Sequence, residues 1–226
     1  MTDWSVKMRK AARSRSKNSG RQKPNGAGRA EKSAARREAI LAAALDEFAA
    51  QGFAATRLDA VAQRAGVAKG TIYLHFRDKD ALFQELVRSV LSRPVGMLET
   101  IAHSDAPVRV LAERIVEVFV QEVYATRRKD VIRLIISEGP RFPKLAEFYY
   151  REVLSRVIKA VRGLLRHAIE RGEIDNEAIV RFPQLLVAPG LVAILWSGLF
   201  DRFEPLDAEA LMRAHLDLLF GRGRVR

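Results

Sequence analysis

The apolar residues of this 226-residue chain recur at helical spacing from about residue 33 onward. Leu41, Leu45 and Phe48 fall at i, i+4 and i+7, which places them on one stripe of a helix. Gly52 follows, at a point where the C-terminal end of a helix favours a residue that tolerates positive φ. The pattern therefore predicts a first helix over residues 33–51.

Two short helices are predicted next, separated by a tight turn. Thr56 lies three residues before Asp59, the spacing of a capping box in which Asp replaces the usual Glu, so a helix should begin near Arg57. Gly66 ends that helix, and residues 69–76 form the next one. Two short helices joined by a turn of about four residues that contains glycine form a helix-turn-helix motif.

The helix predicted over residues 69–76 has two faces of opposite character. Side chains four residues apart share a helix face, so Ile72 and Phe76 should pack together on the core. The polar side chains on the other side are Lys69, Thr71, Tyr73 and His75. They offer hydrogen-bond donors and positive charge, which suits phosphates and base edges in a major groove. By itself, however, such a face is equally consistent with an ordinary solvated surface.

The remainder of the chain keeps the helical period and shows no sustained β alternation or internal repeat. Helices are predicted over residues 79–92, 105–127, 129–138, 143–173, 176–203 and 207–220. The first of these ends near Ser92 or continues past Pro94 with a kink. The inward side of residues 143–173 should include Leu154, Val161 and Leu165. The predicted fold class is all-α.

The net charge of +12 is concentrated at the N-terminus. Residues 1–30 contain nine Lys/Arg and one acidic residue, a net charge of +8, with almost no apolar side chains after Met8. Such a segment cannot bury enough surface to order itself, so a disordered basic arm is expected. The arm either adds affinity for DNA through counterion release or is only a solubilising extension or an imprecisely assigned start. It lacks the apolar run of a secretory signal.

One apolar stretch, residues 185–200 (LLVAPGLVAILWSGLF), needs an explanation. It is shorter than the roughly 20 residues of a spanning helix, and Pro189, Gly190 and Gly198 interrupt it. A buried helix or a subunit interface is expected instead, in which Gly190 and Ala193 permit close helix approach. The chain has no cysteine, which excludes a disulfide framework and a thiolate metal site and is consistent with a cytoplasmic location.

The run FAATRLDAVAQRAGVAKGTIYLHFRDKDALF, residues 53–83, resembles the tetracycline-repressor (TetR) family of bacterial transcription regulators. The similarity covers residues 33–83. It implies that Thr56 anchors the second helix on a phosphate, and that Lys79 holds a phosphate at the start of the fourth. It further implies DNA contacts from the third helix through Lys69, Gly70, Thr71, Tyr73 and His75. Ala68 and Leu74 depart from the commonest pattern, and Ala68 puts one helix cap or phosphate contact in doubt.

The resemblance also implies the organisation of the whole chain. A basic arm (1–30) would precede a helix-turn-helix DNA-binding domain (31–78) and a larger helical effector-binding and dimerisation domain (79–226). The last two long helices would form a homodimer that binds a palindromic operator. A small hydrophobic or aromatic effector would release it, so repression is expected, with activation as the alternative. The candidate effector-pocket residues are Phe119, Tyr124, Phe148, Tyr149, His167 and Trp196, although an aromatic residue at helical spacing can equally be plain core.

Two other classes of protein are less consistent with the sequence. An enzyme would need catalytic or metal-binding spacing, and the pairs that could be drawn, Glu138 with Glu147 or His103 with Asp105, have the scatter of surface residues. No cofactor or metal site is therefore expected. A nonspecific DNA-packaging protein would be basic throughout, whereas residues 31–226 carry only the remaining +4 of the charge.

Overall fold

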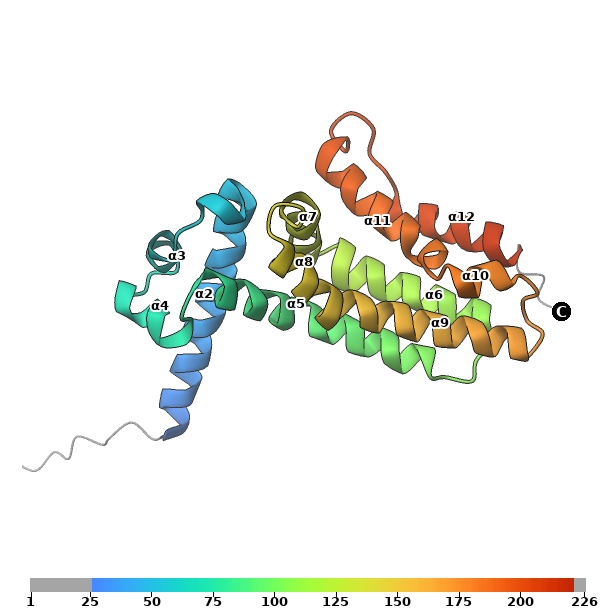
Figure 1. The fold of residues 1–226 in the computed structure, drawn as a ribbon, viewed down its shortest axis with the longest axis horizontal. Coiled ribbons are helices and arrows are strands. Elements are labelled where there is room, and N and C mark those ends of the chain that lie inside the picture. The colour runs from blue at the N-terminus through green and yellow to red at the C-terminus, as the bar shows by residue number, and fades with distance from the viewer. Residues whose placement is uncertain (1–25, 222–226) are drawn as a thin grey trace, which may run out of the picture. The chain divides into compact units, whose positions relative to one another are not determined.

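The computed structural model of the protein describes residues 26–221, and within them the chain is helical without a β-strand (Figure 1). The helical segments are α2 (Gly26–Ala55), α3 (Leu58–Arg64), α4 (Lys69–His75), α5 (Lys79–Ala102), α6 (Val108–Val118), η1 (Phe119–Tyr124), α7 (Arg128–Glu138), α8 (Pro143–Tyr149), η2 (Tyr150–Leu154), α9 (Ser155–Glu170), α10 (Glu177–Arg181), α11 (Gln184–Leu199) and α12 (Ala208–Phe220). The all-α prediction is confirmed.

Two compact units divide the chain, one up to Glu38 and one from Ala39 onward. The packing described below is that of the second unit. Residues 1–25, most of the predicted basic arm, lie outside the described residues, and the expectations for them stay predictions.

The short helices at the centre of the motif, α3 and α4, begin and end close to their predicted positions.

α2 begins seven residues before the predicted Ser33, and Gly52 within it has the non-helical angles φ 74° and ψ 169°. This is the positive φ predicted for that glycine. The capping box predicted at Thr56 is wrong, because α3 follows Arg57 and no side chain caps it.

Two π-helical segments change the register of the longer helices. In η2 (Tyr150–Leu154) the wider turn accommodates one extra residue, which rotates the following side chains around the helix axis. Val153 is consequently buried, and Leu154, predicted to face inward, is exposed. Val161 and Leu165, in the regular helix α9, are buried as predicted.

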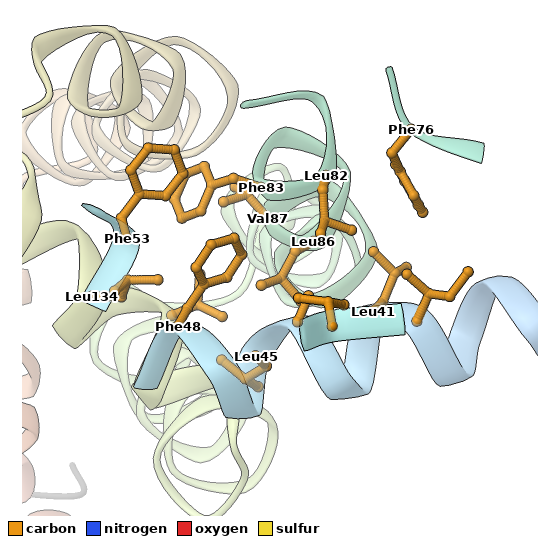
Figure 2. Packing of buried hydrophobic residues seen from close by; sticks show 14 of the residues in the cluster. Leu41, Leu45, Phe48, Phe53, Phe76, Leu82, Phe83, Leu86, Val87 and Leu134 are labelled. Atoms are coloured by element: carbon orange, nitrogen blue, oxygen red, sulfur yellow. The ribbon is translucent and has the colours of Figure 1, made fainter. Parts of the chain in front are cut away.

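The first core joins the helix-turn-helix to the helices that follow it. Figure 2 shows the rings of Phe48, Phe53 and Phe83 meeting there, with centroid separations between 5.5 and 5.9 Å. The same cluster includes Phe76 of the motif and Leu134 of α7. The boundary predicted between residues 78 and 79 therefore runs through one continuous core.

A second core lies among α6, α9, α11, α12 and the C-terminal part of α5. Its buried members include Leu111, Ile115, Leu165 and Met212. Gly190 of α11 is also buried, and a Cβ atom there would lie 2.9 Å from the ring of Phe119. The close approach predicted for Gly190 thus takes place within one chain, against η1.

Two prolines lie inside helices, and each frees a carbonyl that another helix uses. Proline has no N–H, so Pro94 leaves the carbonyl of Val90 without its helical donor. The Nε of Arg128, at the start of α7, donates to that oxygen at 2.7 Å. α5 accordingly continues through Pro94 to Ala102, which confirms the longer of the two predicted helices.

Pro189 in α11 gives the second case. Its position frees the carbonyl of Leu185, and Nε2 of His215 in α12 lies 2.6 Å from that oxygen. The helix predicted over residues 176–203 is instead divided near Phe182 and Pro183 into α10 and α11.

None of the helices in the described part of the chain has both the length and the apolar character needed to cross a membrane.

Candidate nucleic-acid interface

The turn of the helix-turn-helix (residues 58–75) is closed by backbone hydrogen bonds. Gly66 has φ +65°, a conformation that costs glycine little because it has no Cβ. The amide of Gly66 donates to the carbonyl of Gln63 at 3.1 Å, and the amide of Val67 donates to that of Ala62 at 3.0 Å. The angle between α3 and α4 is therefore set by the backbone at the predicted glycine.

The inward face of α4 is buried as predicted. Ile72 is fully buried and Phe76 is 4% exposed, both in the first core. Val61 and Ala62 of α3 belong to the same core. Ala68 precedes α4 without making a side-chain cap, so the doubt about a cap at this position is confirmed.

The outward face of α4 is tied to α3 by Asp59, which was predicted as part of a capping box and not as a contact of α4. Nζ of Lys69 lies 2.7 Å from Oδ2 of Asp59, and the hydroxyl of Tyr73 lies 3.5 Å from Oδ1. The hydrogen bond from Lys69 lowers the pKa of the Asp59 carboxyl and raises the pKa of the Lys69 ammonium. Asp59 thus holds two of the predicted DNA-binding side chains together on the surface.

The other predicted residues of α4 differ in exposure. Gly70 is exposed, and a Cβ atom there would meet nothing within 4 Å, so no contact inside the protein requires glycine. Thr71 and His75 are half-buried. Leu74, which was noted only as a departure from the family pattern, is 84% exposed. An apolar side chain this exposed on a helix surface is a candidate for direct contact with a partner.

Thr56 and Lys79 lie inside the protein's own hydrogen-bond network, apart from the exposed face of α4. Thr56 is 3% exposed, and its hydroxyl donates to the carbonyl of Gly52 at 2.8 Å. Nζ of Lys79 donates to the carbonyls of Phe53 and Ala54 at 2.5 and 2.9 Å. It also lies 4.6 Å from the centroid of the Phe53 ring, and its partial burial lowers its pKa. In this conformation both residues fix the end of α2. The sequence had predicted phosphate contacts for them and not this structural role.

A buried carboxylate joins α2 to the end of α3. Oε1 of Glu47 accepts from Nε of Arg64 at 2.6 Å, and Oε2 accepts from the side-chain Nε2 of Gln51 at 3.0 Å. Glu47 is almost fully buried, so losing Arg64 would leave its charge without compensation. This pair orients α3 from the side opposite its exposed surface.

The six predicted effector-pocket residues lie in separate environments. Phe119 and Tyr124 lie together in η1, with ring centroids 6.5 Å apart, and Trp196 of α11 packs on Phe200, the residue that follows this helix. Phe148 belongs to the first core, where Tyr149 packs against it, and burial raises the pKa of Tyr149 to about 12. His167 is exposed on α9. The fold uses several of these aromatics as core, and their role in effector binding stays a prediction.

A cavity of about 370 Å³ lies elsewhere, among α2, α7 and α11. Phe48 and Ala49 line it from α2, Ile136 from α7 and Leu195 from α11, and the guanidinium of Arg133 adds a polar group. No group of three or more His, Cys, Asp or Glu residues in the described range could hold a metal ion.

Two family models match this chain. Residues 40–86 match a model described as bacterial regulatory proteins, tetR family, and residues 107–218 match one described as tetracyclin repressor-like, C-terminal domain. The transcriptional regulator SrpR of Pseudomonas putida is 30% identical over 164 residues, which cover 72% of this chain and 75% of SrpR. The transcriptional repressor BepR of Brucella suis is 34% identical over 149 residues, 62% of this chain and 69% of BepR.

Solved structures share the fold. The complex of SmeT, the repressor of a Stenotrophomonas maltophilia multidrug efflux pump, with triclosan has a TM-score of 0.70 at 22% identity, covering 82% of this chain and 90% of SmeT. FadR of Bacillus subtilis in complex with stearoyl-CoA has a TM-score of 0.64 at 20% identity, covering 82% and 99% of the two chains.

Proposed function

The chain belongs to the tetR family of bacterial regulatory proteins and is a DNA-binding transcriptional regulator, and we propose that it represses transcription from a palindromic operator until a small effector binds. The observation that carries this proposal is the exposed polar face of α4, whose opposite face is locked into the first core. A helix presented in this way can enter a major groove without rearrangement of the core.

The side chains of α4 suggest how the groove is contacted. Lys69 binds a phosphate, while Tyr73 and His75 donate hydrogen bonds to phosphates or base edges. Leu74 supplies an apolar contact of the kind that thymine methyl groups accept. Because Asp59 holds Lys69 in the free protein, Lys69 exchanges this carboxylate for a phosphate when DNA binds. Thr56 and Lys79 contribute indirectly, by fixing the end of α2.

The exposed apolar side chains of the last helices support a homodimer. On α11 and the loop after it they are Leu185, Leu191, Val192, Leu195, Leu199, Phe200 and Phe203, and on α12 Leu218 is 84% exposed. Large exposed apolar side chains that gather on a few neighbouring elements are typical of protein interfaces. Two copies related by a two-fold axis would present their α4 helices to half-sites about 34 Å apart.

The cavity among α2, α7 and α11 is the best candidate for the effector. Its volume lies within the usual range for small-molecule sites, and its apolar walls surround a few polar groups. α2 also packs against the helix-turn-helix in the first core, so a ligand in the cavity would contact the helix that supports the DNA-binding face. The small molecules held by SmeT and FadR give this proposal general support.

Operator binding is tested with the DNA upstream of the protein's own coding region. Lys69→Ala and Tyr73→Ala should each weaken binding about tenfold to a hundredfold and leave the fold intact. Lys144→Ala, which removes an exposed lysine in α8, is the control and should not change binding. A scrambled fragment bound as tightly as the upstream DNA at physiological salt would refute a specific regulator.

The dimer is tested with two leucines of equal exposure, Leu218 in α12 and Leu74 in α4. Leu218→Glu should give monomers in sedimentation equilibrium, because a carboxylate would be buried without a partner in the interface. Leu74→Glu should remain dimeric and lose operator binding. A monomeric wild-type protein at micromolar concentration would rule out this interface.

The effector site is tested with neighbouring alanines of α2. Ala49 lines the cavity, and Ala50, which is also exposed, does not line it. A thermal-shift screen of hydrophobic small molecules identifies a stabilising compound, and that compound should lose its effect on Ala49→Phe while it retains the effect on Ala50→Phe. Equal responses of the two variants would place the effector elsewhere.

A further inference from the structure

A groove between the C-terminal part of α5 and α9 is lined mainly by cationic side chains. α5 and α9 pack side by side (Figure 1), and the space between their exposed edges has a volume of about 530 Å³. The charged and ionisable side chains lining it are Glu99, His103, Arg156, Lys159, Arg162, Arg166 and His167. We call this site the α5/α9 groove.

The one carboxylate of the groove is already neutralised. Nε and Nη2 of Arg156 donate to the two oxygens of Glu99 at 2.9 and 2.6 Å, a bidentate pair. This pair also lowers the pKa of Glu99, which therefore stays ionised. Arg156 and Glu99 form a fixed wall, and both oxygens of Glu99 are taken up by Arg156, although the nearby charge of Lys159 also contributes to the lowered pKa of Glu99.

The remaining cations, Lys159, Arg162 and Arg166, have no ion pair or hydrogen bond within the part of the chain that the structure describes. Other arginines of the chain are paired. Arg109 lies 2.7 Å from Asp217, and Arg133 lies 3.0 Å from Asp130. Three unpaired cations facing one groove repel each other, and an anion placed between them relieves this repulsion.

The floor of the groove is made of small residues. Ala102 of α5 and Ala160 and Gly163 of α9 line it between the cationic side chains. A Cβ atom at Gly163 would meet nothing within 4 Å, so this part of the floor is open space. A ligand can therefore approach the helix backbone while the longer arginine and lysine side chains close around it.

The spacing of the cations along α9 indicates the size of the anion. Lys159 and Arg166 are seven residues apart, about 10 Å along the helix axis, with Arg162 between them. A single carboxylate could contact only part of this row, whereas linked phosphate groups could contact all of it. Guanidinium groups also match phosphate oxygens in geometry and charge. We propose that the α5/α9 groove binds a small molecule that carries two or more linked phosphate groups.

This site is separate from the proposed operator and effector sites. Ala102 and Ala160 belong to the second core, whereas α4 and the cavity residue Phe48 belong to the first. None of the groove residues lines the cavity among α2, α7 and α11. A failure of the effector proposal would leave the groove proposal standing, and the reverse also holds.

The proposal is tested by titrating the full chain with inorganic tripolyphosphate in a calorimeter at physiological ionic strength. The double variant Arg162→Gln, Arg166→Gln should bind at least about tenfold more weakly than wild type, since each lost charge-assisted contact carries an effect of this size. The control Arg114→Gln, Arg181→Gln removes the same charge from exposed arginines outside the groove and should bind like wild type. The conservative Arg162→Lys, Arg166→Lys variant should retain most of the affinity.

Adenosine triphosphate is titrated in parallel to identify the source of the phosphates. Binding tighter than that of tripolyphosphate supports a nucleotide, and equal binding supports recognition of the phosphate chain alone. Absence of tripolyphosphate binding in wild type, or equal weakening in the groove and control variants, would overturn the proposal. Groove variants that weaken binding of a short non-operator duplex as much as that of tripolyphosphate would also overturn it, in favour of a nucleic-acid contact.

Discussion

The helix-turn-helix and the α5/α9 groove both present cations, but they hold them in opposite ways. In the helix-turn-helix, Lys69 is paired with Asp59, which also lies beside the hydroxyl of Tyr73. In the groove, Lys159 and Arg166 make no ion pair or hydrogen bond with the residues that the structure describes. The pairing in the first surface orients side chains before DNA binding but opposes the binding of any anion. The position of each countercharge therefore distinguishes the two surfaces.

The largest expected effect is a loss of stability in the first core, which supports the helix-turn-helix, while the second core beneath the groove is spared. Phe76→Ala should lower the free energy of unfolding by about 3–5 kcal/mol, because it removes a buried ring from the first core. Operator binding should be lost, while tripolyphosphate binding by the folded fraction should remain, since the groove rests on the second core. Urea denaturation with Tyr73→Ala as control measures the change. Equal losses in the two variants would contradict the assignment of the α4 faces.

A smaller effect tests α5, the helix that links the two surfaces. Arg128→Met should lower the free energy of unfolding by about 1–3 kcal/mol, because the carbonyl of Val90 loses its donor and Glu122 loses its contacts with the guanidinium. Adding Pro94→Ala supplies a backbone N–H for the same carbonyl and should restore part of the loss. A double-mutant cycle in urea quantifies the coupling. Additive changes would show that the freed carbonyl does not matter.

Asp59→Asn makes the helix-turn-helix more like the groove. Removing the countercharge should tighten binding to non-operator DNA by about two- to fivefold, the size of an exposed ion pair. The ratio of operator to non-operator affinity should fall, because the neutral amide offers Lys69 and Tyr73 one acceptor oxygen in place of the two oxygens of the carboxylate. Fluorescence anisotropy with both duplexes at several salt concentrations measures these changes. Unchanged binding to both would remove Asp59 from the mechanism.

The smallest expected effect is the loss of the ion pair between Lys69 and Asp59 when acid protonates the Asp59 carboxyl. The folded protein lowers the pKa of Asp59, so the stabilisation from its pair is present above the ordinary Asp value of 3.8 and is lost as the pH falls through the lowered one. An NMR titration of the Asp59 carboxyl should therefore give a lower midpoint in wild type than in Lys69→Met. Identical midpoints would mean that the pair does not persist in solution.

The sequence predicted the local features of the helix-turn-helix well. Ile72, Phe76 and the turn at Gly66 follow from spacing within one helix or one turn, which a linear pattern records. The contact of Asp59 with Lys69 depends on how two helices cross, and the crossing is fixed by backbone bonds that the pattern does not contain.

Prediction was weaker where a side chain had more than one chemically reasonable partner. Lys79 could bind a phosphate or helix carbonyls, and the structure shows the carbonyls of α2. The aromatics of the expected effector pocket served equally well as core. The sequence contains a signal for the groove that was not recognised. Residues 159, 162 and 166 recur at i, i+3 and i+7, opposite the apolar stripe of α9. The cations become notable only when Glu99 is found to be already paired.

The hydrogen bond between His215 and the carbonyl freed by Pro189 has a consequence for association kinetics. It joins α12 to α11 within one chain, so the relative position of the two helices is set before a second copy arrives. Side chains and segments that are ordered beforehand lose less entropy on association. Encounters between two such chains should therefore succeed more often than encounters between chains that must first align these helices. A single backbone oxygen in α11 would in this way influence how fast the proposed dimer forms.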